Sequence, residues 1–142
     1  MCQHKTRETV WLPELIEHEN GAVGLSAIVV IATDPETSAR GFARLFKDGE
    51  VVERDGGWKV ITGPNSADLL VLDREKASSL YPNVDLDKTP ASAFAVLRIR
   101  VSSLDKARAA LTTHGASFVP TSAGVAVLPE NASGTVLEFS EQ

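Results

Sequence analysis

The sequence predicts an α+β fold made of two similar β-α-β-β-β units. The first observation is a strand followed by an amphipathic helix over residues 24–46 (GLSAIVVIATDPETSARGFARLF). The second is a later copy of the same order over residues 94–115 (FAVLRIRVSSLDKARAALTTHG). Each copy ends its strand at a residue type that caps helices, Asp34 in the first and Ser102 or Ser103 in the second. Hairpin signals follow each copy, which indicates a duplicated unit.

The first unit begins with a buried strand. Residues 25–33 are nearly all apolar and rich in Val and Ile, which is typical of a strand buried on both faces. Asp34 then supplies an N-cap and Pro35 the first helical position. The apolar residues that follow fall on one stripe of a helix: Ala39, Phe42, Ala43 and Phe46. Three further strands are predicted around tight turns: residues 51–54, 58–62 and 68–73.

The second unit repeats this order. A strand over residues 94–101 leads into a helix that Gly115 ends. The apolar stripe of that helix comprises Leu104, Ala107 and Leu111. The remaining strands are predicted over residues 118–121, 124–128 and 135–140.

The length and composition suit one compact domain, because 142 residues with 43% hydrophobic side chains can bury a single core. We divide the chain into an N-terminal arm over residues 1–23 and one domain over residues 24–142. The domain comprises a first module over residues 24–73, a linker over 74–92 and a second module over 93–142. Residues 74–92 are polar and contain two prolines, which is typical of a linker between the modules. A second interpretation of this segment is a lid.

The charge and the cysteine content exclude several classes of protein. A net charge of −5 with scattered Lys and Arg argues against nucleic-acid binding, which needs a basic face. No apolar stretch approaches the roughly 20 residues of a membrane helix, and the N-terminus has no secretory signal. The single cysteine, Cys2, allows no internal disulfide and predicts a cytoplasmic location.

Residues 24–142 resemble the vicinal oxygen chelate superfamily, the fold of glyoxalase I, bleomycin-resistance proteins and extradiol dioxygenases. The resemblance rests on the paired units, on the junctions ATDPETSARGFARLF and RVSSLDKARAALTTHG, and on the closing segment PENASGTVLEFSE. That segment is similar to a recurring final-strand motif of the family, with Gly134 and Glu138 in place. The resemblance implies a curved, half-barrel mixed β-sheet with a central cup, helices outside, and a homodimer.

The same resemblance implies four metal-ligand positions, one on the first and one on the fourth strand of each unit. They fall at Ala27, Leu70, Val96 and Glu138. Only Glu138 carries a donor atom, and one carboxylate cannot hold a catalytic Zn, Ni or Fe ion. We therefore expect no cofactor and no inherited metal chemistry.

Strand alternation predicts what the cup contains instead. If Val96 faces inward, then Phe94, Arg98 and Arg100 do so too. Arg98 and Glu138 are then the main charged groups of an apolar cup. Either Arg98 binds a carboxylate or other anion, with Glu138 positioning it or accepting a proton, or the two form an internal ion pair that fills a former metal site.

Other residues are weaker site candidates. Trp58 is interpreted either as a ligand-stacking residue or as part of the core. His18, beside Asn20-Gly21, is either a general base that reaches over the cup or a solvated turn residue.

Three hypotheses for function remain open. The favoured one is a glyoxalase-like domain without the usual metal that binds a small, anionic organic ligand through Arg98, Glu138, Arg100 and Trp58. The alternative is a metal-dependent lyase, isomerase or dioxygenase with rearranged ligands, in which Glu138 acts with His18 or His4 on Zn, Ni, Mn or Fe. The third is a structural or dimerisation module, in which the arm packs on a second chain.

Overall fold

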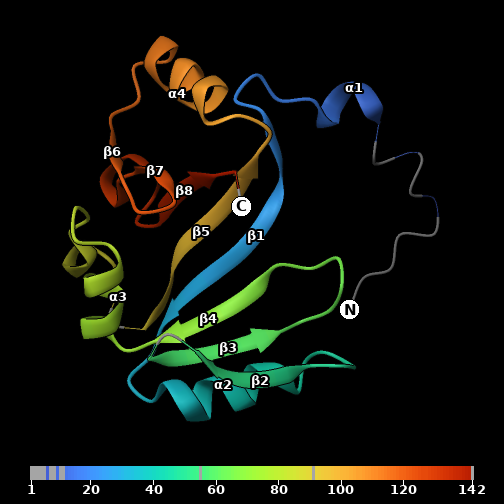
Figure 1. The fold of residues 1–142 in the computed structure, drawn as a ribbon, viewed down its shortest axis with the longest axis vertical. Coiled ribbons are helices and arrows are strands. Elements are labelled where there is room, and N and C mark those ends of the chain that lie inside the picture. The colour runs from blue at the N-terminus through green and yellow to red at the C-terminus, as the bar shows by residue number, and fades with distance from the viewer. Residues whose placement is uncertain (1–5, 7–8, 10–11, 55, 91, 142) are drawn as a thin grey trace.

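The computed structural model describes residues 6, 9, 12–54, 56–90 and 92–141. Cys2 and His4, about which the sequence analysis made predictions, lie outside the described residues. A single eight-stranded mixed sheet has the strand order β2-β3-β4-β1-β5-β8-β7-β6. It curves around a concave face, with the two halves meeting at the centre (Figure 1). The predicted α+β fold of two β-α-β-β-β modules is confirmed.

The first half of the sheet contains four strands and one long helix. Its elements are β1 (Ala22–Ile31), α2 (Pro35–Ala43), β2 (Glu50–Arg54), β3 (Gly57–Ile61) and β4 (Asp68–Leu72). The short helix α1 (Pro13–Ile16) precedes them. The apolar stripe of α2 packs on the convex face of this half, where Ala39 and Ala43 are buried against Val60 and Val71.

The second half repeats the arrangement. Its elements are β5 (Ala93–Val101), α4 (Leu104–Thr113), β6 (Phe118–Pro120), β7 (Gly124–Val127), the 3-10 turn η3 (Pro129–Asn131) and β8 (Val136–Ser140). The Ser103 side chain accepts a hydrogen bond from the Lys106 N–H, as Asp34 does from the Thr37 N–H. Ser103, rather than Ser102, is therefore the N-cap of α4.

Strand pairing relates the two halves. β1 and β5 run antiparallel at the centre of the sheet. On either side of them, β1 pairs in parallel with β4 and β5 pairs in parallel with β8. In these parallel ladders Val29 lies opposite Leu70, and Arg98 lies opposite Glu138. The duplicated sequence therefore sets Arg98 beside Glu138 through the backbone register alone.

The linker lies on the concave face rather than outside it. It contains α3 (Arg74–Leu80) and the 3-10 turn η2 (Leu86–Lys88). Ala77, Tyr81 and Leu86 are buried there in one core cluster with Val29 and Val96 of the central strands. Figure 1 shows α3 on this side, away from α2 and α4. One helix of the fold thus fills part of the cup.

One predicted orientation is wrong. Phe94 does not face the cup, since its ring lies 5.9 Å from that of Phe42 on α2, between centroids. The cause is a register shift, in which Val29 pairs with Val96 but Val30 pairs with Phe94. The extra β5 residue, Ala95, forms a bulge that turns the strand over at this point. None of the helices in the described part of the chain is long and apolar enough to span a membrane.

Candidate functional site

The centre of the site is a buried carboxylate. Glu138 is 0% exposed. Its Oε2 accepts hydrogen bonds from the Tyr81 hydroxyl and from Arg98 Nε, both at 2.7 Å. Its Oε1 accepts one from the Thr121 hydroxyl, also at 2.7 Å. Both oxygens therefore have donors, and Arg98 provides the opposite charge that a buried carboxylate requires.

Hydrogen bonds fix the Nε edge of the Arg98 guanidinium group. The Nε–H is shared between Glu138 and the Tyr81 hydroxyl oxygen, which lies 2.9 Å away. The guanidinium carbon also lies 5.7 Å from the centroid of the Tyr81 ring, within the range of a cation–π contact. The terminal nitrogens Nη1 and Nη2 form no hydrogen bond with any other described residue. Arg98 thus presents two oriented donors on its other edge.

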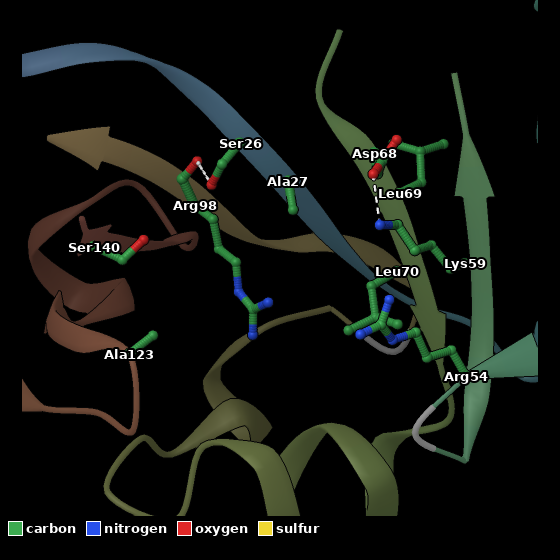
Figure 2. A pocket seen from close by; sticks show the side chains of 10 residues that line it. All are labelled: Ser26, Ala27, Arg54, Lys59, Asp68, Leu69, Leu70, Arg98, Ala123 and Ser140. Atoms are coloured by element: carbon green, nitrogen blue, oxygen red, sulfur yellow. Dashed lines mark hydrogen bonds and ion pairs between the residues drawn. The ribbon is translucent and has the colours of Figure 1, made fainter. Parts of the chain in front are cut away.

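These two donors face a cavity of about 440 Å³ on the concave side of the sheet. Figure 2 shows the Arg98 side chain entering it from β5. The cavity is lined by Ser26, Ala27, Arg54, Lys59, Asp68, Leu69, Leu70, Arg98, Ala123 and Ser140. Its volume is in the range of small-molecule sites.

The charged residues that line the cavity are three cations, Arg54, Lys59 and Arg98, and one carboxylate, Asp68. Lys59 Nζ and Asp68 Oδ2 lie 2.7 Å apart and offset each other. Arg98 pairs with Glu138, which does not itself line the cavity.

Burial and neighbouring groups shift the pKa values in the cluster. Burial acts to lower the pKa of Arg98, but Tyr81 and Glu138 outweigh it and raise the pKa overall. Arg98 is therefore charged at every physiological pH. Burial, and then the Glu138 charge, raise the pKa of Tyr81, although Arg98 opposes them. Tyr81 accordingly acts as a neutral hydrogen-bond donor and not as a base.

Comparison with solved structures shows which fold this is. The crystal structure of methylmalonyl-CoA epimerase from Mycobacterium tuberculosis is similar with a TM-score of 0.62 and 17% identity, over 87% of this chain and 90% of that one. A selenomethionine methylmalonyl-CoA epimerase structure has a TM-score of 0.58 and 12% identity, over 86% and 97%. A hypothetical protein from Bacillus halodurans C-125 has a TM-score of 0.57 and 14% identity, over 84% and 94%.

The chain has the vicinal oxygen chelate fold. The predicted resemblance is confirmed at the level of the fold, which is all that identities this low support. No family model matches the sequence, and no curated protein does so either.

The four positions that the resemblance assigns to metal ligands occupy different parts of this vicinal oxygen chelate fold. Ala27 and Leu70 line the cavity. Val96 and Glu138 are 0% exposed and do not line it. In the part of the chain that the structure describes, no group of three or more His, Cys, Asp or Glu side chains is placed to hold a metal ion.

Two predicted ligand-binding residues lie outside the cavity. Trp58 packs on the convex face with the α2 cluster, as its alternative interpretation as a core residue expects, and the guanidinium carbon of Arg40 lies 5.8 Å from its ring centroid. The reason is strand alternation, since the next residue, Lys59, lies opposite inward-facing Leu70 and takes the concave face. Arg100 is exposed in an adjacent hollow, which shares only Ser26 with the main cavity.

The predicted catalytic candidates are separated in space. His18 lines a shallow hollow on the first half of β1 and does not line the main cavity. Glu138 lies behind Arg98 as seen from the cavity, so it is placed to position Arg98 and not to contact a ligand directly. The remaining described histidine, His114, contacts the Glu19 carboxylate through Nε2 at an exposed position.

Five residues of the site were not among the predicted site residues. Tyr81 and Thr121 complete the Glu138 cluster, and both lie in irregular segments where no periodicity predicts a direction. Arg54, Lys59 and Asp68 line the cavity. Alternation could have found Lys59 and Asp68, because each is in register with a residue already expected to face inward, Lys59 with Leu70 and Asp68 with Ala27.

Proposed function

We propose that this chain binds a small organic anion in its cup without the help of a metal ion. The observation that carries the proposal is the geometry of Arg98. Its Nε edge is fixed by Glu138 and Tyr81, and its two terminal nitrogens point into the cavity. A guanidinium group held this way matches the two oxygens of a carboxylate.

The two interpretations of Arg98 are compatible in this arrangement. The ion pair with Glu138 uses one edge of the guanidinium, at 2.7 Å, and leaves the other edge for a ligand. The Arg98 side chain is 24% exposed, whereas that of Glu138 is 1% exposed. Glu138 therefore serves to orient the arginine, and the arginine contacts the ligand.

The donor set does not favour the metal-dependent alternative. At the four positions that the resemblance implies, the sole carboxylate already accepts three hydrogen bonds and pairs with a cation. Catalytic metal sites use about three protein ligands with an open position. The residues at these positions do not fit a divalent ion, and we derive no reaction through one.

Calorimetric titration with a panel of small carboxylates at low salt tests the proposal. Arg98→Lys keeps a cation beside Glu138 but loses the planar pair of donors, so we expect at least about tenfold weaker binding. Arg100→Gln is the matched control, since Arg100 lies on the same strand outside this cavity, and it should leave binding unchanged. Circular dichroism shows whether each variant is folded.

Two results would overturn the proposal. One is a folded Arg98→Lys variant that binds as tightly as the native chain. The other is the absence of binding by every carboxylate in the panel at millimolar concentration. Metal analysis of protein purified without chelator or affinity tag separates the alternative, because a stoichiometric ion would favour metal-dependent chemistry. A homodimer and a cytoplasmic location belong to the same proposal.

A further inference from the structure

The ion pair of Lys59 and Asp68 lines the main cavity, and the proposed binding of an anion at Arg98 does not use it. Lys59 Nζ and Asp68 Oδ2 lie 2.7 Å apart, and the two side chains are 31% and 24% exposed. Asp68 is two residues before Leu70, the cross-strand partner of Lys59, so the two side chains are diagonal neighbours on the concave face. The pair is therefore accessible to a ligand in the cavity.

This ion pair presents a donor group and an acceptor group side by side. Among the described residues, Asp68 Oδ1 accepts no hydrogen bond, and the Lys59 ammonium group has no partner other than Asp68. An ammonium group carries three N–H donors, and a carboxylate has two acceptor oxygens, so each group has capacity left for a ligand. The pair thus favours a neutral ligand group that accepts and donates at adjacent atoms.

A primary carboxamide has this pattern of adjacent donor and acceptor. Its carbonyl oxygen accepts and its NH₂ donates from the same planar group. Against the ion pair, the oxygen accepts from Lys59 and the N–H donates to Asp68, and the charged partners make both hydrogen bonds strong. A carboxylate at this position would lie against Asp68, and an ammonium group would lie against Lys59, so repulsion between like charges disfavours both.

The backbone register relates the ion pair to Arg98. Ala27 lies in register with Asp68 on β4 and with Arg98 on β5. Neighbouring strands are about 4.8 Å apart, so roughly 10 Å separates the Asp68 and Arg98 backbones. Figure 2 shows Lys59 and Asp68 on one side of Ala27 and the Arg98 side chain on the other. Because Ala27 lines the cavity between them with a small apolar side chain, this surface suits a short hydrocarbon segment.

We propose that the ligand of this cavity is an aliphatic carboxylic acid with a terminal carboxamide. Its carboxylate lies on Arg98, its amide lies on Lys59 and Asp68, and its aliphatic chain crosses Ala27. This inference rests on the proposed function and specifies its ligand class. It requires a donor and an acceptor at the end remote from the carboxylate, which neither a simple fatty acid nor an ionised diacid supplies.

The test compares each amide with an ester of nearly equal size and equal charge. Succinamate, glutaramate and adipamate are titrated calorimetrically at low salt, each beside the monomethyl ester of the same diacid. The ester keeps the carboxylate and the carbonyl oxygen but has no N–H donor for Asp68. We expect at least one amide to bind about tenfold more tightly than its ester, because the ester leaves the Asp68 oxygen without a partner.

Removal of the ion pair as a unit should abolish this preference. The double variant Lys59→Met, Asp68→Ala removes one charge of each sign, so the attraction of a carboxylate to Arg98 is retained. We expect this variant to bind amide and ester equally. The matched control is Lys88→Met, Glu130→Ala, which removes an exposed ion pair outside the cavity and should preserve the preference. Circular dichroism shows whether each variant is folded.

The outcomes separate the two proposals. If every amide binds the native chain only as tightly as its ester, the amide inference is overturned while anion binding at Arg98 stands. That comparison needs no variant, so it decides the inference even if the double variant does not fold. A preference that persists in the folded double variant also overturns the inference, because other residues would then recognise the amide. If no amide and no ester binds at millimolar concentration, the proposed function itself fails.

Discussion

The ionisation of Tyr81 provides the most direct test of the buried cluster. Tyr81 is the single tyrosine of the chain, and it is 2% exposed. Its hydroxyl donates to the Glu138 carboxylate and accepts from Arg98 Nε. Burial is the larger cause of its raised pKa, and the Glu138 charge is the second. We expect it to ionise well above the ordinary value of about 10.

The direction of the effect on stability follows from that shift. Below about pH 10 the phenol is protonated in both the folded and the unfolded chain, and its contribution does not change. Above that value the unfolded chain releases a proton that the folded chain retains. The contribution of Tyr81 to the free energy of unfolding therefore falls as pH rises, by about 1.4 kcal/mol per pH unit, until the folded-state pKa is reached.

Near-ultraviolet absorbance of the phenolate reports Tyr81 alone, since the chain has no other tyrosine. The titration midpoint in native protein should lie well above the midpoint in urea. Glu138→Gln should lower the native midpoint, because it removes the neighbouring negative charge and leaves burial as the main cause. Tyr81→Phe should lose the part of the alkaline destabilisation that Tyr81 contributes. Equal midpoints in native and denatured protein would refute the buried cluster.

The remaining predictions concern stability and assembly. Glu138→Ala should lower the free energy of unfolding by about 3–5 kcal/mol in urea titrations, because it leaves the donors around the carboxylate unpaired, and a loss below about 1 kcal/mol would contradict this. Gly41→Ala, inside α2 with open space around the added methyl group, should raise it by about 0.5–1 kcal/mol. Gly124→Ala should lower it, because a Cβ there would lie 2.0 Å from the Phe139 carbonyl oxygen, and a gain in stability would be inconsistent with this packing. The proposed homodimer should appear in light scattering at micromolar concentration, and a strict monomer would exclude it.

Most of the fold could be predicted from local patterns in the sequence. The apolar run over residues 25–33 predicts a central strand, observed as Ala22–Ile31. The stripe that follows predicts a helix, observed as Pro35–Ala43. The first signal is a continuous apolar run and the second is a set of apolar residues on the helical period, and neither needs knowledge of the rest of the chain. The position of α3 inside the cup depends on packing against distant strands, and no local period encodes it.

The site was only partly predictable for the same reason. The pairing of Arg98 with Glu138 follows from the register of two parallel strands, which duplication makes visible in the sequence. Tyr81 reaches the same carboxylate from the linker, 57 residues before it in the chain. Trp58 and Lys59 could have been assigned correctly, because alternation allows only one of them to face the cup, and pairing with Leu70 selects Lys59.

The chemistry of Arg98 gives a physical basis for the proposed binding of an anion without a metal ion. In a metal site, a divalent cation held by protein ligands keeps open positions for the oxygens of a substrate. Here a buried carboxylate at one of the implied ligand positions holds a guanidinium instead, at 2.7 Å. That group is also a cation, and its two terminal nitrogens are donors in a fixed plane. In the proposed function, hydrogen bonds from Arg98 to two adjacent oxygens of the ligand therefore take the place of metal coordination.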